Sequence, residues 1–261
     1  MRPDDAFYRP DGDGFLATPW TRGPWDPGAQ HGGPPTALMI RACERRAADL
    51  GDFELARVTV DFLRAVPIAR CTVDVDVLRA GHRAVGFAAA LHADGHLCAR
   101  ADTLFIRRAD LPIPPDLQIP DDPVDPTALR EQVFDFFPDP VGYHTAMEGR
   151  IGTCPQRPGF GDIWLRQRGR LVAGEDPTPA QRVAVAADAI NGVGFALDIT
   201  RYTFVNADLT IYLHRRPVGE WIRLQSTHLS QPCGRGLVDA TLADVRGPIG
   251  RALEAQVLAL R

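Results

Sequence analysis

The sequence predicts an α+β protein made of two similar halves, each with one long helix packed against an antiparallel sheet. In each half, two strand-like stretches precede a helix-like stretch, and stretches of alternating apolar and polar residues follow it. The halves match without gaps over their middle, because Thr59, Arg64 and Leu91 each recur as the same residue type at one offset (215 − 64 = 151). A proline-rich stretch separates the halves. Together these observations indicate an internal duplication.

The first half contains strands, one helix and then more strands. Turn residues bound two short strand-like stretches, at 7–16 and 17–25. Two consecutive prolines at 34 and 35 favour the start of a helix, which should end near Gly51. From there the hydrophobic period changes to two. The expected strands are 71–77, 85–91 and 97–107, with an Asp94-Gly95 hairpin turn between the last two.

The second half repeats this plan after a linker. Residues 109–126 carry six prolines, which cannot lie in a central strand. We therefore expect an N-terminal domain at 1–108, a linker at 109–126 and a C-terminal domain at 127–261. Pro177-Thr178-Pro179 should open the second helix, which should end at Asn191-Gly192. The expected strands are 145–153, 161–168, 202–213, 221–229, 236–243 and 249–260.

Composition excludes several classes of function. The net charge is −4, so the chain has no surplus of positive charge for binding nucleic acid. It has no lysine, which excludes Schiff-base chemistry and a P-loop lysine. Its two serines, Ser226 and Ser230, do not lie in a G-x-S-x-G motif, which excludes the nucleophile elbow of serine hydrolases.

The cellular setting is also predicted. Five scattered cysteines without a C-x-x-C motif favour free thiols in a reducing cytoplasm. The acidic start, residues 1–5, does not resemble a signal peptide, and no apolar stretch is long enough to span a membrane. His92 and His96 flank a turn without further candidate ligands, so we expect no metal site. We expect no cofactor.

Several segments resemble the thioesterase-like superfamily. Residues 23–38, which include His31-Gly32-Gly33-Pro34-Pro35, resemble the entry to that family's first helix. Residues 174–192 resemble its second helix, and residues 207–215 and 250–256 resemble its C-terminal sheet. The resemblance covers nearly the whole chain. It implies two fused hot-dog domains, a double hot-dog, similar to the acyl-CoA thioesterase II enzymes.

The resemblance also implies a site. Asp208, Thr227 and Gln256 match the three residues that hold the hydrolytic water in acyl-CoA thioesterase II. The carboxylate would be the base. We expect Asp208 to lie within hydrogen-bond reach of Gln256, directly or through one water, with both facing the start of the first helix. There, the N–H groups of Gly32 and Gly33, with His31 beside them, should form an oxyanion hole. Asp188 and Asn191, near the end of the second helix, are given a structural role.

The implied activity is hydrolysis of an acyl-CoA or acyl-carrier thioester to a free acid and a thiol. Two alternatives stay open. One is a non-catalytic acyl-thioester binding protein on the same fold. The other is a hot-dog enoyl-CoA hydratase or dehydratase, although the hydratase pattern Gly-Asp-x-Asn-Pro is missing. Since members of this family commonly associate, we also expect a homo-oligomer, at least a dimer. The acyl chain is not predicted.

Overall fold

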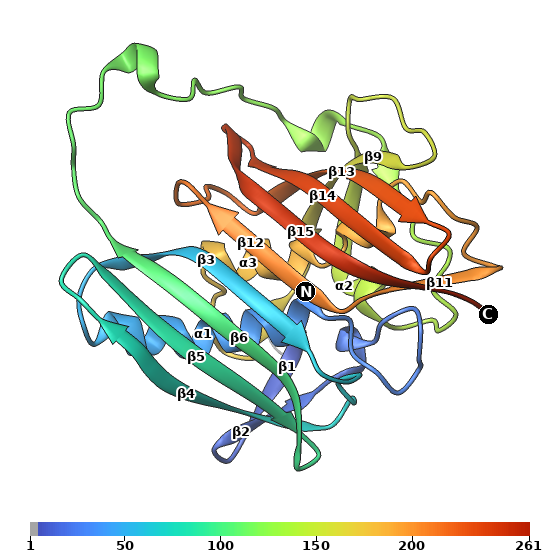
Figure 1. Cartoon of the computed structure of the whole chain (residues 1–261), viewed down its shortest axis with the longest axis horizontal. Helices are drawn as coiled ribbons and strands as arrows, with labels where there is room; N and C mark the ends of the chain where they lie inside the picture. The colour runs from blue at the N-terminus through green and yellow to red at the C-terminus, as the bar shows by residue number, and fades with distance from the viewer. Residues whose placement is uncertain (1–4) are drawn as a thin grey trace.

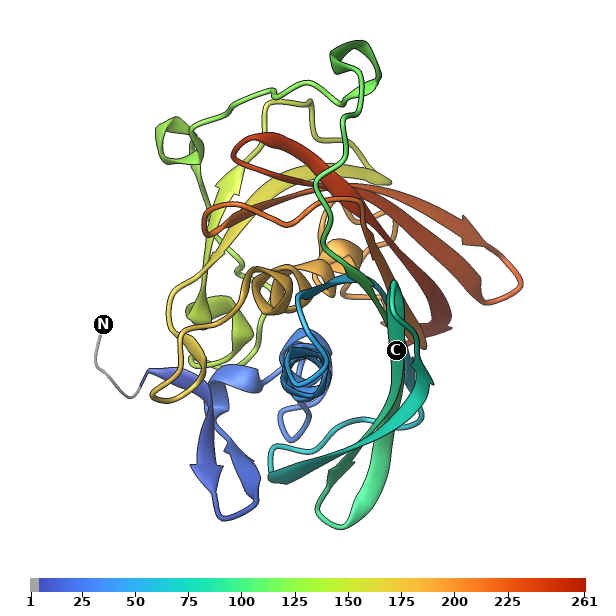
Figure 2. The same ribbon diagram turned by 90° about the vertical axis from the view of Figure 1, so that its left-hand side faces the viewer.

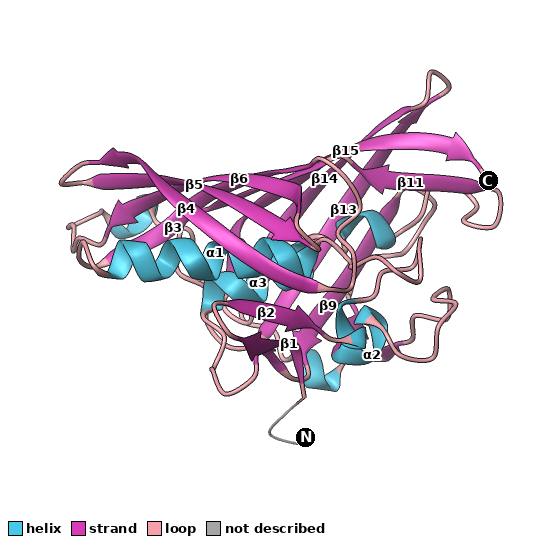
Figure 3. Cartoon of the chain, turned by 90° about the horizontal axis from the view of Figure 1, so that it is seen from below, coloured by secondary structure: helices cyan, strands magenta, loops and turns pink. Residues whose placement is uncertain are grey.

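A computed structural model describes residues 5–261. The first four residues, on which most of the signal-peptide prediction rests, lie outside the described part. Within residues 5–261, fifteen strands form one sheet that curves around two helices (Figures 1 and 2). The helices lie between the long central strands on one side and the first two strands on the other (Figure 3). No helix within residues 5–261 has the length and apolar character needed to cross a membrane.

The first half contributes one helix and six strands: β1 (Ala6–Asp11), β2 (Gly14–Ala17), α1 (Gly33–Ala48), β3 (Phe53–Phe62), β4 (Arg70–Ala80), β5 (Ala84–Ala93) and β6 (His96–Arg107). The Asp94-Gly95 turn joins β5 to β6, and both turn residues have positive φ (50° and 75°). Two positive φ values in succession are what a two-residue hairpin turn requires.

The second half contributes two helices and nine strands: β7 (Glu131–Gln132), α2 (Tyr143–Ala146), β8 (Met147–Ile151), β9 (Phe160–Gln167), β10 (Arg170–Val172), α3 (Pro179–Ala187), β11 (Tyr202–Asn206), β12 (Asp208–Leu213), β13 (Trp221–Gln231), β14 (Arg235–Asp244) and β15 (Gly247–Leu260). Four short 3-10 turns, η1 to η4, lie at Pro19–Thr21, Pro115–Leu117, Pro126–Ala128 and Ile190–Gly192.

The sheet confirms the duplication and the double hot-dog fold. The strand order is β2-β4-β5-β6-β3 in the first half and β9-β13-β14-β15-β12 in the second. The halves join where β3 pairs with β12 in antiparallel fashion, and Thr59 lies opposite Thr210, its own equivalent 151 positions later. Adding 151 to the bounds of β4 and β5 gives the bounds of β13 and β14.

Some local predictions were wrong. Ala17 ends β2, and residues 18–25 form one 3-10 turn and a loop instead of a strand, since Pro19 and Pro24 interrupt them. The second helix stops at Ala187 and continues only as the turn Ile190–Gly192. The predicted strand 202–213 is interrupted at Ala207, because β11 pairs only with β15 whereas β12 also pairs with β3. The short strands β7 and β10 were missed; β10 pairs with β1 in parallel.

The two helices, α1 and α3, pack side by side and antiparallel at the centre of the core, so the start of each lies next to the end of the other. A Cβ on Gly33 would lie 2.4 Å from the Val185 carbonyl oxygen, so only glycine lets the start of α1 approach the end of α3 this closely. At the other end of the pair, Glu44 of α1 accepts hydrogen bonds from Thr178 and Gln181, the two capping residues of α3. These close contacts fix the ends of both helices.

Candidate active site

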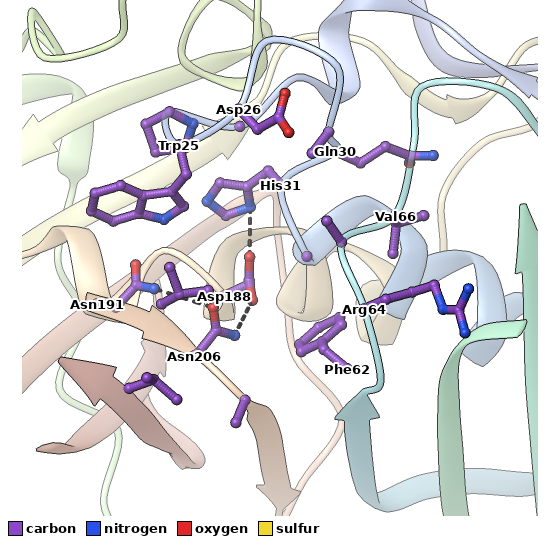
Figure 4. A pocket seen from close by; sticks show the side chains of 18 residues that line it. Trp25, Asp26, Gln30, His31, Phe62, Arg64, Val66, Asp188, Asn191 and Asn206 are labelled. Carbon is purple, nitrogen blue, oxygen red and sulfur yellow. Dashed lines mark hydrogen bonds and ion pairs between the residues drawn. The ribbon is translucent and has the colours of Figure 1, made fainter. Parts of the chain in front are cut away.

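A cavity of about 450 Å³ lies where α1 begins and α3 ends (Figure 4). Its walls come from the loop before α1, the segment after β3, the end of α3 and the strand pair β11–β15. Most of the lining is apolar, and a few polar groups converge on one wall. An apolar cavity with convergent polar groups is the usual form of a small-molecule site. The residues that matter below are Trp25, His31, Gly32, Phe62, Arg64, Asp188, Asn191 and Asn206.

An imidazole and a carboxylate form the centre of the polar wall. His31 Nδ1 lies 2.7 Å from Asp188 Oδ2, and only 9% and 3% of the two side chains is exposed. The His31 ring stacks on Tyr143 with the two ring centroids 3.8 Å apart. The Tyr143 hydroxyl donates to the Val185 carbonyl at 2.8 Å, which fixes the stacking partner against α3. The imidazole is therefore held both in its plane and by its Nδ1 edge.

Two asparagines hold the carboxylate from the other side. The Asn206 amide donates to Asp188 Oδ1 at 2.9 Å, and the Asn191 amide donates to Asn206 Oδ1 at 3.4 Å. Asn206 ends β11 and Asn191 lies in the turn after α3. Each oxygen of Asp188 thus has a donor, and Figure 4 shows the contacts to His31 and Asn206 as a continuous line of polar groups. This arrangement leaves little freedom for the carboxylate to rotate.

The backbone at the start of α1 also lies at this place. Pro34 and Pro35 have no N–H, and the Thr36 N–H donates to the Gly32 carbonyl. Gly33 N–H donates to His31 Nδ1 at 3.3 Å, a bond that is lost in the tautomer or imidazolium that carries a proton on Nδ1 and donates it to Asp188. Among residues 5–261, the Gly32 N–H has no partner and lies in the cavity wall, whereas the Gly33 N–H is directed at His31.

A second acidic side chain lies nearby on β15. Glu254 is fully buried, and neither carboxyl oxygen has a hydrogen-bond partner among residues 5–261. Burial raises the pKa of Glu254 well above its usual value, and the charges of Asp188 and Asp208 raise it further. Burial without a partner therefore favours the neutral form of this carboxyl group.

The structure does not bring the three predicted catalytic residues together. Among residues 5–261, Asp208 and Gln256 form no direct hydrogen bond, and a contact through one water stays a prediction. None of the three lines the cavity at the start of α1. Asp208 lies on the outer face of the sheet, opposite the buried Leu209, and its Oδ1 accepts the Ala255 N–H at 2.6 Å. Thr227 is exposed on the same face. Their catalytic roles stay predictions without a shared site.

The third residue, Gln256, lies on the inner face of the sheet. It is buried beside Phe204 and His228, and its Nε2 has no partner among residues 5–261. Side chains alternate along a strand, so Thr227 and Gln256, placed by sequence alone, fall on opposite faces. The residues predicted to form the oxyanion hole do lie together: His31 and Gly32 line the cavity, and Gly33 begins α1 beside them.

Sequence reasoning missed the residues that surround His31. Asp188 and Asn191 were considered, but polar residues near the end of a helix usually have a structural role. One signal favours a site: Asp188 follows a run of alanine and valine in α3, a buried environment in which an acid needs a partner. Asn206 had no signal, because its position depends on the interruption of the strand at Ala207.

At the opposite end of the helix pair, the helices are joined by a different set of polar contacts. There, Glu44 is held by Thr178 and Gln181, and Arg41 donates two hydrogen bonds to Glu175 at 2.6 and 2.7 Å. These contacts involve neither a histidine nor an aspartate, so the His31–Asp188 pair is not repeated at this end. Among the described residues, no three His, Cys, Asp or Glu side chains are grouped so as to bind a metal ion.

Comparisons with known proteins agree with this fold. The C-terminal domain of acyl-CoA thioesterase matches residues 117–258, and its N-terminal domain matches residues 21–106. No curated protein sequence matches the chain.

Solved structures extend the likeness over most of the chain. A conserved protein with a hot-dog fold from Alicyclobacillus acidocaldarius has a TM-score of 0.73 and 16% identity, over 98% of this chain and 97% of that one. The TesB protein of Mycobacterium avium subspecies paratuberculosis has a TM-score of 0.67 and 17% identity, over 94% and 92%. An acyl-CoA thioesterase II from Mycobacterium marinum has a TM-score of 0.66 and 14% identity, over 90% and 91%.

These structures show the shared fold, and the two domain matches show the family. Because the C-terminal match alone covers more than half of the chain, the protein belongs to the acyl-CoA thioesterase family of thioester hydrolases.

Proposed function

We propose that this chain hydrolyses acyl-CoA thioesters in the cavity at the start of α1, and that His31 and Asp188 activate the water. The observation that supports this most strongly is the 2.7 Å contact between His31 Nδ1 and Asp188 Oδ2 in the wall of that cavity. It lies beside the backbone N–H of Gly32 at a helix N-terminus. A base and an oxyanion donor next to each other are the two parts that acyl transfer to water requires.

The hydrogen bonds favour His31 over Asp188 as the base. In the tautomer with its proton on Nδ1, His31 donates to Asp188 Oδ2 while Asn206 donates to Oδ1, so both carboxylate oxygens are engaged. With its proton on Nδ1, the His31 ring keeps the lone pair on Nε2, which has no partner among residues 5–261. That nitrogen takes the proton of the attacking water. Asp188 holds the ring orientation and stabilises the imidazolium that forms.

The remaining steps follow from the thioester. The water oxygen bonds to the carbonyl carbon, and the carbonyl oxygen becomes an oxyanion near Gly32 and Gly33. Removing one such donor costs about 3 kcal/mol of transition-state stabilisation. The C–S bond then breaks, the acid is released, and the leaving thiolate takes the proton from the His31 imidazolium. Atoms and charges balance without a cofactor.

Aromatic side chains support a place for the acyl group. A small cavity of about 30 Å³ shares Trp25, His31 and Asn191 with the main cavity. Phe134, Phe136 and Phe195 also line it, and the same three rings line a third cavity of about 410 Å³. An acyl chain placed there would leave the carbonyl next to His31 and the carrier in the main cavity.

The test is hydrolysis of a panel of acyl-CoAs of increasing chain length, followed by the appearance of free thiol. The wild-type protein should release thiol, and His31→Ala should not, with an unchanged circular dichroism spectrum. Saturable binding of acyl-CoA without thiol release would instead favour the acyl-thioester binding protein, and hydration of crotonyl-CoA would favour the hydratase. A homo-oligomer and a cytoplasmic location stay predictions.

A further inference from the structure

An exposed arginine lies on the rim of the cavity without a partner. Arg64 follows β3 and lines the cavity together with Ala65 and Val66. No acceptor among residues 5–261 lies within hydrogen-bond or ion-pair distance of its guanidinium group. In Figure 4 this group extends along the edge of the cavity, away from the His31–Asp188 contact.

The duplication shows what the same arginine does in the other half. Arg215 is the equivalent of Arg64, since 215 − 64 = 151. The backbone is equivalent at both places: Leu63 N–H donates to the Cys98 carbonyl at 2.9 Å, and His214 N–H donates to the Ile249 carbonyl at 3.0 Å. The two arginines therefore leave the sheet at the same point of the fold.

Arg215 is held as a structural residue. Its two terminal nitrogens donate to Asp244 at 2.5 and 2.6 Å, and its side chain also donates to the carbonyls of Pro248 and Gly247. Asp244 is fully buried and accepts the Val218 N–H as well. In the second half, this carboxylate ties the segment after β12 down against the sheet.

The first half lacks that carboxylate. The equivalent of Asp244 is Ala93, since 244 − 151 = 93. The segment after β3 bonds instead to the loop before α1: Gln30 N–H donates to the Val66 carbonyl and Ile68 N–H donates to the Gly28 carbonyl, both at 2.8 Å. This exchange forms one wall of the cavity and leaves the Arg64 guanidinium free at its rim.

We propose that Arg64 binds a phosphate group of the substrate's carrier, so that the cavity takes thioesters borne on a phosphorylated pantetheine arm. This inference rests on the proposed thioester hydrolysis and extends it to recognition of the carrier. A guanidinium group presents a rigid fork of donors that matches the oxygens of a phosphate. The apolar stretch between Arg64 and His31, with Phe62 and Val66, suits the uncharged part of the arm.

The phosphorylated arm is common to coenzyme A and to the prosthetic group of an acyl carrier protein. The decisive comparison therefore uses three small thioesters with the same acyl group: acyl-CoA, acyl-phosphopantetheine and acyl-pantetheine. Only the last lacks phosphate. Arg64→Ala should raise KM about 10-fold for the first two, as expected for loss of one charge-assisted contact, and leave KM for acyl-pantetheine and all three kcat values unchanged.

A matched control and a conservative variant sharpen the test. Arg83→Ala removes another exposed arginine, in the turn before β5 and at the far end of that strand from Ala93, and should change nothing. Arg64→Lys should keep part of the affinity, because an ammonium group binds phosphate as a point charge. An equal rise in KM for all three thioesters, or no rise for the two that carry phosphate, would overturn the inference.

The carrier and the reaction are tested separately. To identify the source of the arm, the wild-type KM for the acyl-CoA is compared with that for the same acyl group on an acyl carrier protein. The carrier with the lower KM is the one used, and Arg64→Ala should raise that KM. If the wild-type protein hydrolyses none of the thioesters, the proposed function fails. Calorimetry then still tests Arg64: Arg64→Ala must weaken the binding of coenzyme A and leave the binding of pantetheine unchanged.

Discussion

Replacing Asp188 by asparagine isolates the contact on which the proposed chemistry depends. The side chain keeps its shape, and its oxygen can still accept the Asn206 amide at the 2.9 Å position of Oδ1. The new amide group then faces His31 Nδ1, where the carboxylate oxygen lay at 2.7 Å. Because an amide donates, Nδ1 must accept, and the ring proton moves to Nε2. The nitrogen that should take the proton from water is then blocked.

The expected loss in kcat for Asp188→Asn is about 10² to 10⁴-fold, the usual contribution of a general base. This corresponds to about 3 to 5 kcal/mol of transition-state stabilisation. Thiol release at saturating acyl-CoA measures kcat, and a thermal melt checks that the variant is folded. Asp208→Asn is the matched control, since the Asp208 side chain lies on the outer face, where its Oδ1 accepts the Ala255 N–H. Near-normal kcat for Asp188→Asn, or an equal loss for Asp208→Asn, would refute the assignment.

Four further outcomes are expected. Gly33→Ala should lower the free energy of unfolding by about 1 to 3 kcal/mol, because the new Cβ would lie 2.4 Å from the Val185 carbonyl oxygen. Gly192→Ala, whose Cβ would lie 3.8 Å from the nearest atom, should not, and thermal melts compare the two variants. Glu254→Gln should raise Tm at pH 8 and have little effect at pH 4. Burial raises the folded-state pKa of Glu254, so the wild-type protein loses stability as the pH rises above the unfolded-state pKa of about 4.3. An equal change in Tm at both pH values would contradict this. Phe136→Ala should improve kcat/KM for longer acyl chains, since the ring lies between two cavities, and an unchanged chain-length profile would exclude it from the acyl path. Light scattering should give at least a dimer at micromolar concentration, and a strict monomer would contradict the predicted assembly.

The fold was largely accessible from the sequence because duplication and periodicity are long-range patterns. The 151-residue offset predicted that the halves share a plan, and the pairing of Thr59 with Thr210 is its direct consequence. The elements that were missed depend on local geometry. The strand β10 is only three residues long, and it is defined by its pairing with β1 in the other half.

The candidate site could be predicted only in part from the sequence, because the direction in which a strand residue points is not readable there. His31 and Gly32 were found because a glycine pair before a helix indicates close approach, and Gly33 does approach α3 closely. To choose between Asp188 and Asp208 as the acidic residue of the site, one must know whether each side chain points into the core or to the outer face of the sheet. A strand gives no such signal when an interruption such as that at Ala207 resets the alternation between faces.

The most direct test of the central claim is a crystal structure of the chain with a non-hydrolysable acyl-CoA analogue. The claim predicts the carbonyl oxygen of the analogue within about 2.7 to 3.1 Å of the Gly32 or Gly33 nitrogen, with an ordered water between His31 Nε2 and the carbonyl carbon. An analogue whose carbonyl lies beside Asp208 and Thr227 on the outer face of the sheet, away from His31, would contradict it.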